Sequence, residues 1–146
     1  MNDLVKAMQL PALRQLQPGE YAYTLDPTSK RGRELLAVAC RGKPASIKKA
    51  ANTTIEVEHL VYYTFDKIDK QSGEVKRLPR LVVIAPNGSM FAMSGWKAIE
   101  DVLFPCSVLG IQPPFKPPLR FAVSMITCGD EGREYAALEW VMEVKK

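Results

Sequence analysis

An alternating stretch over residues 53–68 constrains the fold of this chain more than any other feature. Ile55, Val57 and His59 would lie on one face of a strand, and Thr54 and Glu56 on the other. β-Branched and aromatic residues at a period of two are typical of a β-strand. We therefore expect one long strand here. Neighbouring strand residues point to opposite faces, so of Tyr62 and Tyr63 we expect one ring to pack and the other to be exposed.

Turn signals divide the following residues into further strands. The polar, glycine-containing segment 69–74 predicts a hairpin loop, and Asn87-Gly88 suits the positive dihedral angles of a tight turn. The apolar run Leu81–Ile84 lies between them. We expect strands near 53–68, 75–85, 88–94, 119–128 and 133–144. The fold class is therefore mainly β.

Two segments have helical spacing instead. Residues 30–41 follow Ser29, which can cap a helix, and precede Gly42, which can end one. A second helix is predicted over 94–109, capped by Ser94 and interrupted by Pro105. The first thirty residues are predicted to be an arm with an extended piece at Tyr21–Leu25. This organisation predicts two parts: an N-terminal arm and basic helix over 1–45, and a β-domain over 46–146.

Residues for catalysis or metal binding do not cluster in the sequence. His59 is the single histidine, and a packed or hydrogen-bonded role is expected for it. Cys40, Cys106 and Cys128 lack the spacing of a zinc or redox motif. We find no phosphate-binding glycine loop. The sequence predicts no catalytic residues, no metal and no cofactor, and thus a binding protein rather than an enzyme.

The compartment is predicted from what the chain lacks. No apolar run approaches the ~18 residues that cross a bilayer, and the first residues do not resemble a signal peptide. We expect a cytoplasmic protein without a membrane partner.

Positive charge is concentrated near the N-terminus. The net charge is +4, and most of the excess lies between Lys30 and Lys49, where Glu34 is the only acidic residue. Such a cluster attracts polyanions. It is equally typical of a solvated helix face or a flexible arm, so these alternatives stay open.

Aromatic and basic residues also occur together along the predicted strands. Unpaired bases stack on aromatic rings while cations follow the phosphates. This mixture predicts a site for single-stranded nucleic acid. The expected stacking residues are Tyr62 or Tyr63, Phe65 and Phe91. The expected phosphate contacts are Lys48, Lys49, Lys67, Lys76, Arg77, Arg80, Arg120 and Arg133.

The order of these elements carries a family resemblance over about residues 46–146. A long strand precedes Gln71-Ser72-Gly73-Glu74-Val75, and the turn at Asn87-Gly88 precedes a short strand ending at Ser94. A helix then ends near Gly110-Ile111-Gln112-Pro113-Pro114, and a final hairpin contains Gly132-Arg133-Glu134-Tyr135-Ala136-Ala137-Leu138. This order resembles the small single-stranded DNA-binding proteins of bacteriophages, in their OB-like form.

The resemblance implies a fold, a function and partners. The implied fold is a five-stranded OB-like barrel with one helix between strands three and four. The implied function is to coat or protect exposed single strands during phage DNA replication, without sequence preference, in the cytoplasm of a bacterial host. Single-stranded DNA is the expected partner, with further copies of the chain and replication proteins as additional candidates.

A second hypothesis stays open beside this one. The chain could instead be a protein-interaction module, such as a virion or accessory structural component, that assembles through its N-terminal arm. The preference for DNA or RNA is also open at this point.

Overall fold

The protein has two β-sheets and two α-helices in the part of the chain that its computed structural model describes, residues 21–110, 114–128 and 133–141. The mainly β class is therefore confirmed. The helices are α3 (Lys30–Arg41) and α4 (Trp96–Leu109), with a short 3-10 helix η1 (Ile47–Ala50). The strands are β1 (Tyr21–Tyr23), β2 (Ala45–Ser46), β3 (Thr54–Val57), β4 (His59–Ile68), β5 (Val75–Ile84), β6 (Met90–Met93), β7 (Leu119–Cys128) and β8 (Arg133–Trp140).

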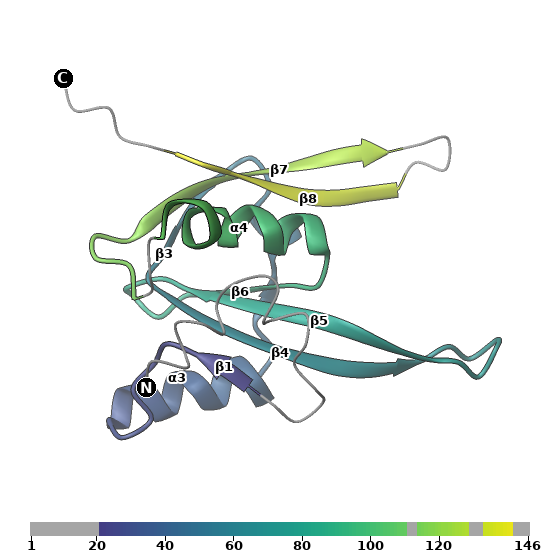
Figure 1. Cartoon of the computed structure of the whole chain (residues 1–146), viewed down its shortest axis with the longest axis horizontal. Helices are drawn as coiled ribbons and strands as arrows, with labels where there is room; N and C mark the ends of the chain where they lie inside the picture. Colours follow the sequence, from purple (N-terminus) through teal and green to yellow (C-terminus); the bar gives the residue numbers. More distant parts are fainter. Residues whose placement is uncertain (1–20, 111–113, 129–132, 142–146) are drawn as a thin grey trace.

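The strands form a five-stranded sheet in the order β1-β4-β5-β6-β2 and a three-stranded sheet in the order β3-β7-β8 (Figure 1). Among the described strands, no pairing joins one sheet to the other. The expected single barrel of five strands is therefore not confirmed, and the strand count was wrong. It omitted the short strand β2, and it counted β3 and β4 as one. The extended piece expected at Tyr21–Leu25 contains strand β1, but it belongs to the five-stranded sheet and not to a separate arm.

The segment predicted as one strand over 53–68 is divided at Glu58. β3 pairs with β7, placing Ile55 opposite Phe121, whereas β4 pairs with β5, placing Leu60 opposite Val83. The Glu58 N–H donates to the carbonyl oxygen of Ile84 at 2.8 Å, and its own carbonyl accepts from Phe115 N–H at 2.8 Å. Both backbone groups of the crossing residue are satisfied, so the chain changes sheets within one residue.

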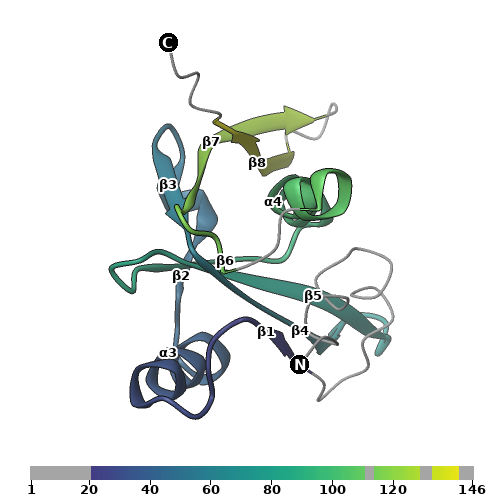
Figure 2. The ribbon, with the colours of Figure 1, turned by 60° about the vertical axis from the view of Figure 1, so that its left-hand side comes forward.

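Apolar clusters cover both faces of the five-stranded sheet. On one face Leu60, Tyr62, Leu81 and Val83 pack with α4 and the three-stranded sheet. On the other face Val61, Tyr63, Val82 and Ile84 pack with Leu25 and with Ala39 of α3. Figure 2 shows α3 and α4 on opposite sides of β4 and β5. Tyr62 and Tyr63 are consequently both buried, and the expectation that one ring would be exposed was wrong.

The first helix has the predicted bounds and caps. Ser29 Oγ accepts from Gly32 N–H at 2.9 Å, and Gly42 N–H donates to the Val38 carbonyl at 2.8 Å. α4 begins at Trp96, after Gly95, which supplies no side-chain cap. The predicted start and cap at Ser94 were therefore wrong. The helix ends at Leu109 and is capped by Gly110, whose φ of +70° suits glycine.

The other predicted elements match with small shifts. β5 and β7 fall on the predicted segments, whereas β6 is shorter than 88–94 and β8 ends at Trp140. The predicted extension of the last strand over 142–144 lies outside the described residues, as do residues 1–20 of the arm. The division of the chain at residue 45 stays a prediction.

Candidate nucleic-acid interface

The hairpin of β4 and β5 extends beyond its neighbours in the sheet. β1 pairs only with Val61–Tyr63 of β4, and β6 only with Leu81–Ile84 of β5, yet β4 and β5 pair as far as Ile68 and Val75. Residues 64–68 and 75–80 therefore form a two-stranded projection, which we call the ribbon (Figure 1).

The loop at the tip of the ribbon has a defined geometry. Asp69 N–H donates to the Glu74 carbonyl at 2.8 Å, and Asp69 Oδ1 accepts from Gln71 N–H at 2.9 Å. The hydrogen bond from Gln71 N–H to the Asp69 carboxylate lowers the pKa of Asp69, because it stabilises the ionised form. The predicted loop over 69–74 is thus confirmed, with Gly73 at a φ of +73°.

One face of the ribbon, together with the adjoining Tyr63, collects aromatic and cationic side chains. The register places Tyr63 opposite Arg80, Phe65 opposite Leu78, and Lys67 opposite Lys76. Opposed residues share a face of the sheet, and so do residues two apart. We call this set the aromatic–basic face: Tyr63, Phe65, Lys67, Lys76, Leu78 and Arg80. No acidic residue belongs to it.

Arg80 is the central contact of the aromatic–basic face. Its guanidinium carbon lies 5.1 Å from the centroid of the Phe65 ring, a cation–π distance. Its Nη1 donates to the Tyr63 hydroxyl at 3.4 Å. Its buried Nε has no hydrogen-bond partner, and Arg80 forms no ion pair within the described residues. Its charge is therefore held in place without being neutralised by a carboxylate.

The opposite face of the ribbon has a different chemistry. Arg77 lies there beside Asp66, with 3.8 Å between Nε and Oδ1, so a carboxylate offsets its charge. Tyr62 shares this parity but is 0 % exposed in the core. Its prediction as a stacking residue was wrong, because α4 and the three-stranded sheet cover its face of the five-stranded sheet.

Other predicted site residues lie away from the aromatic–basic face. Phe91 of β6 is half-buried against the core on the opposite side of the sheet. Lys48 and Lys49 are exposed on η1, which contacts β6, β7 and β8. Arg120 is exposed on β7 opposite Glu56. Arg133 begins β8, and its side chain lies outside what the structure describes.

Two residues of the aromatic–basic face, Leu78 and Tyr21, were not predicted from the sequence. Leu78 could have been found, because it has the parity of Lys76 and Arg80. Tyr21 pairs with Tyr63, with ring centroids 5.3 Å apart, and is 43 % exposed. It extends the aromatic–basic face by one more ring. No local signal could place it there, because the pairing of β1 with β4 spans about forty residues.

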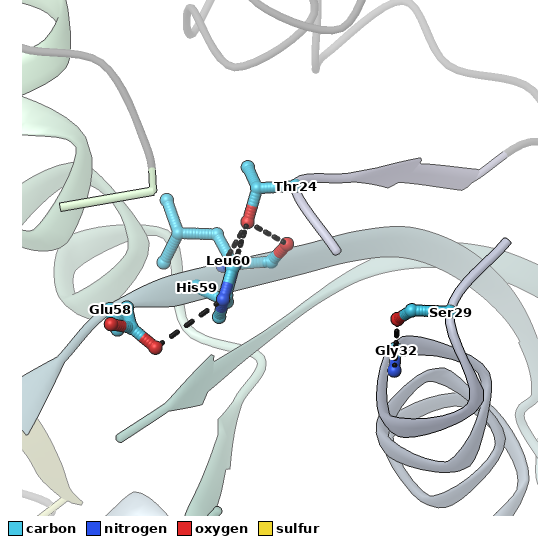
Figure 3. A network of polar contacts seen from close by, with 6 residues as sticks. All are labelled: Thr24, Ser29, Gly32, Glu58, His59 and Leu60. Carbon is cyan, nitrogen blue, oxygen red and sulfur yellow. Dashed lines mark hydrogen bonds and ion pairs between the residues drawn. The ribbon is translucent and has the colours of Figure 1, made fainter. Parts of the chain in front are cut away.

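His59 joins β4 to the segment after β1 through hydrogen bonds (Figure 3). Thr24 Oγ1 lies 3.1 Å from His59 Nδ1 and accepts from Leu60 N–H at 3.0 Å. Glu58 lies 3.4 Å from Nε2. Burial lowers the pKa of His59, although Glu58 opposes the shift. The prediction of a hydrogen-bonded histidine is confirmed.

The cysteines are placed as apolar residues where their side chains are described. Cys106 lies in the core, where burial raises its pKa to about 11, and burial also raises the pKa of half-buried Cys40. Within the described ranges, no three His, Cys, Asp or Glu residues gather as metal ligands would. No helix in that part of the chain has the length and apolarity to cross a membrane.

Comparisons of the chain with protein-family models, curated proteins and solved structures found no match.

Proposed function

We propose that this chain is a single-stranded DNA-binding protein that coats exposed strands without sequence preference, as in phage DNA replication. The observation that carries the proposal is the aromatic–basic face, where the rings of Tyr21 and Phe65 lie beside Lys67, Lys76 and Arg80, and buried Tyr63 supports them from below. Cations bind phosphates of any sequence, and rings stack on any unpaired base. Paired bases are not available for stacking, so single strands are favoured over duplex.

The order of elements supports an OB-like fold with an open seam. β3 and β4 together act as one bent strand that pairs with both β5 and β7, and α4 lies between β6 and β7. In an OB-fold the loops after the first and fourth strands help to bind oligonucleotides. The corresponding hairpins here are β4–β5 and β7–β8. The ribbon and the paired ends of β7 and β8 extend to the same side of the molecule (Figure 1).

The test is a titration of the full chain with labelled oligo-dT, duplex DNA and RNA at two salt concentrations. An OB-fold covers about 4–16 nucleotides, so the oligonucleotide should exceed that length. Phosphate contacts from Lys67, Lys76 and Arg80 predict a log–log salt slope of about −2, at about 0.7 per contact. Equal affinity for duplex, or affinity that ignores salt, would rule the proposal out. The RNA titration decides the nucleic-acid preference.

A protein-interaction module remains the second candidate, supported by exposed apolar side chains. Ile68 and Val75 face each other at the ribbon tip and are 65 % and 61 % exposed. Such residues suit contact with another copy of the chain or with a replication protein. If the I68S/V75S variant lost self-association in sedimentation, while the wild-type protein ignored oligo-dT, this function would replace the first.

A further inference from the structure

A cleft of about 610 Å³ lies between the two sheets. Its walls come from the end of β6 and the start of α4 on one side, and from η1 and β8 on the other. The lining includes Lys48, Arg80, Ser94, Trp96, Lys97 and Tyr135. β6 and β8 belong to different sheets and do not pair, which leaves this space open. The volume is in the range of small-molecule sites.

Two aromatic residues from different elements line the cleft. Trp96 is half-buried and packs on the core, its ring centroid 6.4 Å from that of buried Tyr62. Tyr135 is half-buried on β8. A flat ligand with a π-face suits walls that contain two aromatic side chains.

The charge of the lining selects an anionic form of such a ligand. Lys97 is engaged by Asp101, with 2.9 Å between Nζ and Oδ1. Lys48 and Arg80 form no ion pair with any described residue, and the buried Arg80 Nε has no hydrogen-bond partner. The exposed Glu134 is the one acidic residue among the described lining. Two cations without a carboxylate partner, in a lining that also holds two aromatic side chains, match a base that carries its phosphate.

Arg80 connects the cleft to the aromatic–basic face, because it lines the cleft and contacts Phe65 and Tyr63. We propose that one nucleotide of the bound single strand enters the cleft, with its base at Trp96 and Tyr135 and its phosphate at Lys48 and Arg80. This inference rests on the proposed function. It adds a site for a single base to a surface that otherwise binds the backbone and stacked bases.

Tryptophan fluorescence tests the proposal, because the chain has two tryptophans, Trp96 and Trp140. Trp140 is also half-buried against the core but is not part of the cleft lining. The W140F variant leaves Trp96 as the reporter, and W96F leaves Trp140. Titration with oligo-dT should quench the emission of W140F and leave that of W96F unchanged, while anisotropy of a labelled oligonucleotide measures binding independently.

A matched pair of lysines provides the second measurement. Lys48 lines the cleft and its neighbour Lys49 does not, although both are exposed on η1. K48A should weaken oligo-dT binding several-fold and make the log–log salt slope about 0.7 less negative. K49A should leave the affinity within about twofold.

The outcomes separate the two proposals. If oligo-dT binds with unchanged Trp96 emission, or if K48A and K49A lose affinity equally, the cleft proposal is overturned and the proposed function stands. If oligo-dT does not bind at all, both are overturned.

Discussion

Phe65 is the residue at which stacking on the aromatic–basic face is best isolated. Its ring lies 5.1 Å from the Arg80 guanidinium carbon and outside the apolar clusters of the core. We predict that F65A weakens oligo-dT binding by about 1–3 kcal/mol, the usual contribution of one stacked base, and that F65Y restores most of it. Fluorescence anisotropy of a labelled oligonucleotide measures both.

Phe104 gives a matched control for this substitution. It is 49 % exposed on α4 and does not belong to the aromatic–basic face, so F104A should leave oligo-dT affinity unchanged. Loss of affinity in F104A equal to that in F65A would contradict a specific role for Phe65.

His59 makes stability depend on pH in a predictable direction. Burial lowers its pKa below 6.5, so the unfolded chain binds the imidazole proton more readily than the folded protein. Its contribution to stability is therefore complete above 6.5 and is lost as the pH falls through the folded pKa. We predict that urea unfolding shows a steeper loss of stability between about pH 7.5 and 5.5 for the wild-type protein than for H59N. Parallel pH profiles would show that His59 does not titrate this way.

At the scale of elements, the start of α3 depends on a close backbone approach at Gly32. A Cβ placed there would lie 1.9 Å from the Asp26 carbonyl oxygen. Alanine normally favours a helix over glycine by about 1 kcal/mol, but here the clash dominates. G32A should lower the free energy of unfolding by about 1–3 kcal/mol, measured by urea titration.

Gly95, at the start of α4, is the control for this prediction because a Cβ built on it would have no atom within 4 Å apart from those of Gly95 and its two chain neighbours. G95A should cost less stability than G32A. A G32A protein more stable than wild type would show that the approach to Asp26 does not constrain α3.

The ribbon should be the least stable part of β4 and β5, because none of the other described strands pairs with it. Local opening is easiest where few buried apolar contacts hold an element. We predict that hydrogen-bonded amides of residues 64–68 and 75–80 exchange faster than those of 60–63 and 81–84, and that oligo-dT slows the former. Uniform exchange along both strands, unchanged by DNA, would contradict this picture of the ribbon.

Elements and hairpins with strong local signals could be predicted from the sequence, and pairings between segments far apart in the sequence could not. Ser29 and Gly42 mark both ends of α3 because capping is a local interaction. The break at Glu58 has no such mark, because it depends on distant hydrogen-bond partners, Ile84 and Phe115. The uninterrupted alternation over residues 53–68 therefore gave no indication that the chain passes from one sheet to the other at Glu58.

At the scale of the whole molecule, coverage of the sheet determines which rings can bind a ligand. The sequence separated Tyr62 from Tyr63 by parity, but the presence of α3 on one face and α4 on the other decides that both are buried. The register places four of the predicted site residues, Phe65, Lys67, Lys76 and Arg80, on one face of the ribbon. Arg77 lies on the opposite face of the ribbon, and the predicted residues of η1 and β7 lie outside the ribbon.

The most direct test of a binding surface on one face of the ribbon compares Lys76 with its neighbour Arg77. Both are exposed cations on β5, but they lie on opposite faces. K76A and R77A remove the same charge, so a difference between them reports the face and not the net charge. We predict that K76A weakens oligo-dT binding and makes the log–log salt slope about 0.7 less negative, while R77A keeps the wild-type slope. Equal losses in the two variants, or a larger loss in R77A, would contradict the assignment of single-stranded DNA binding to the aromatic–basic face.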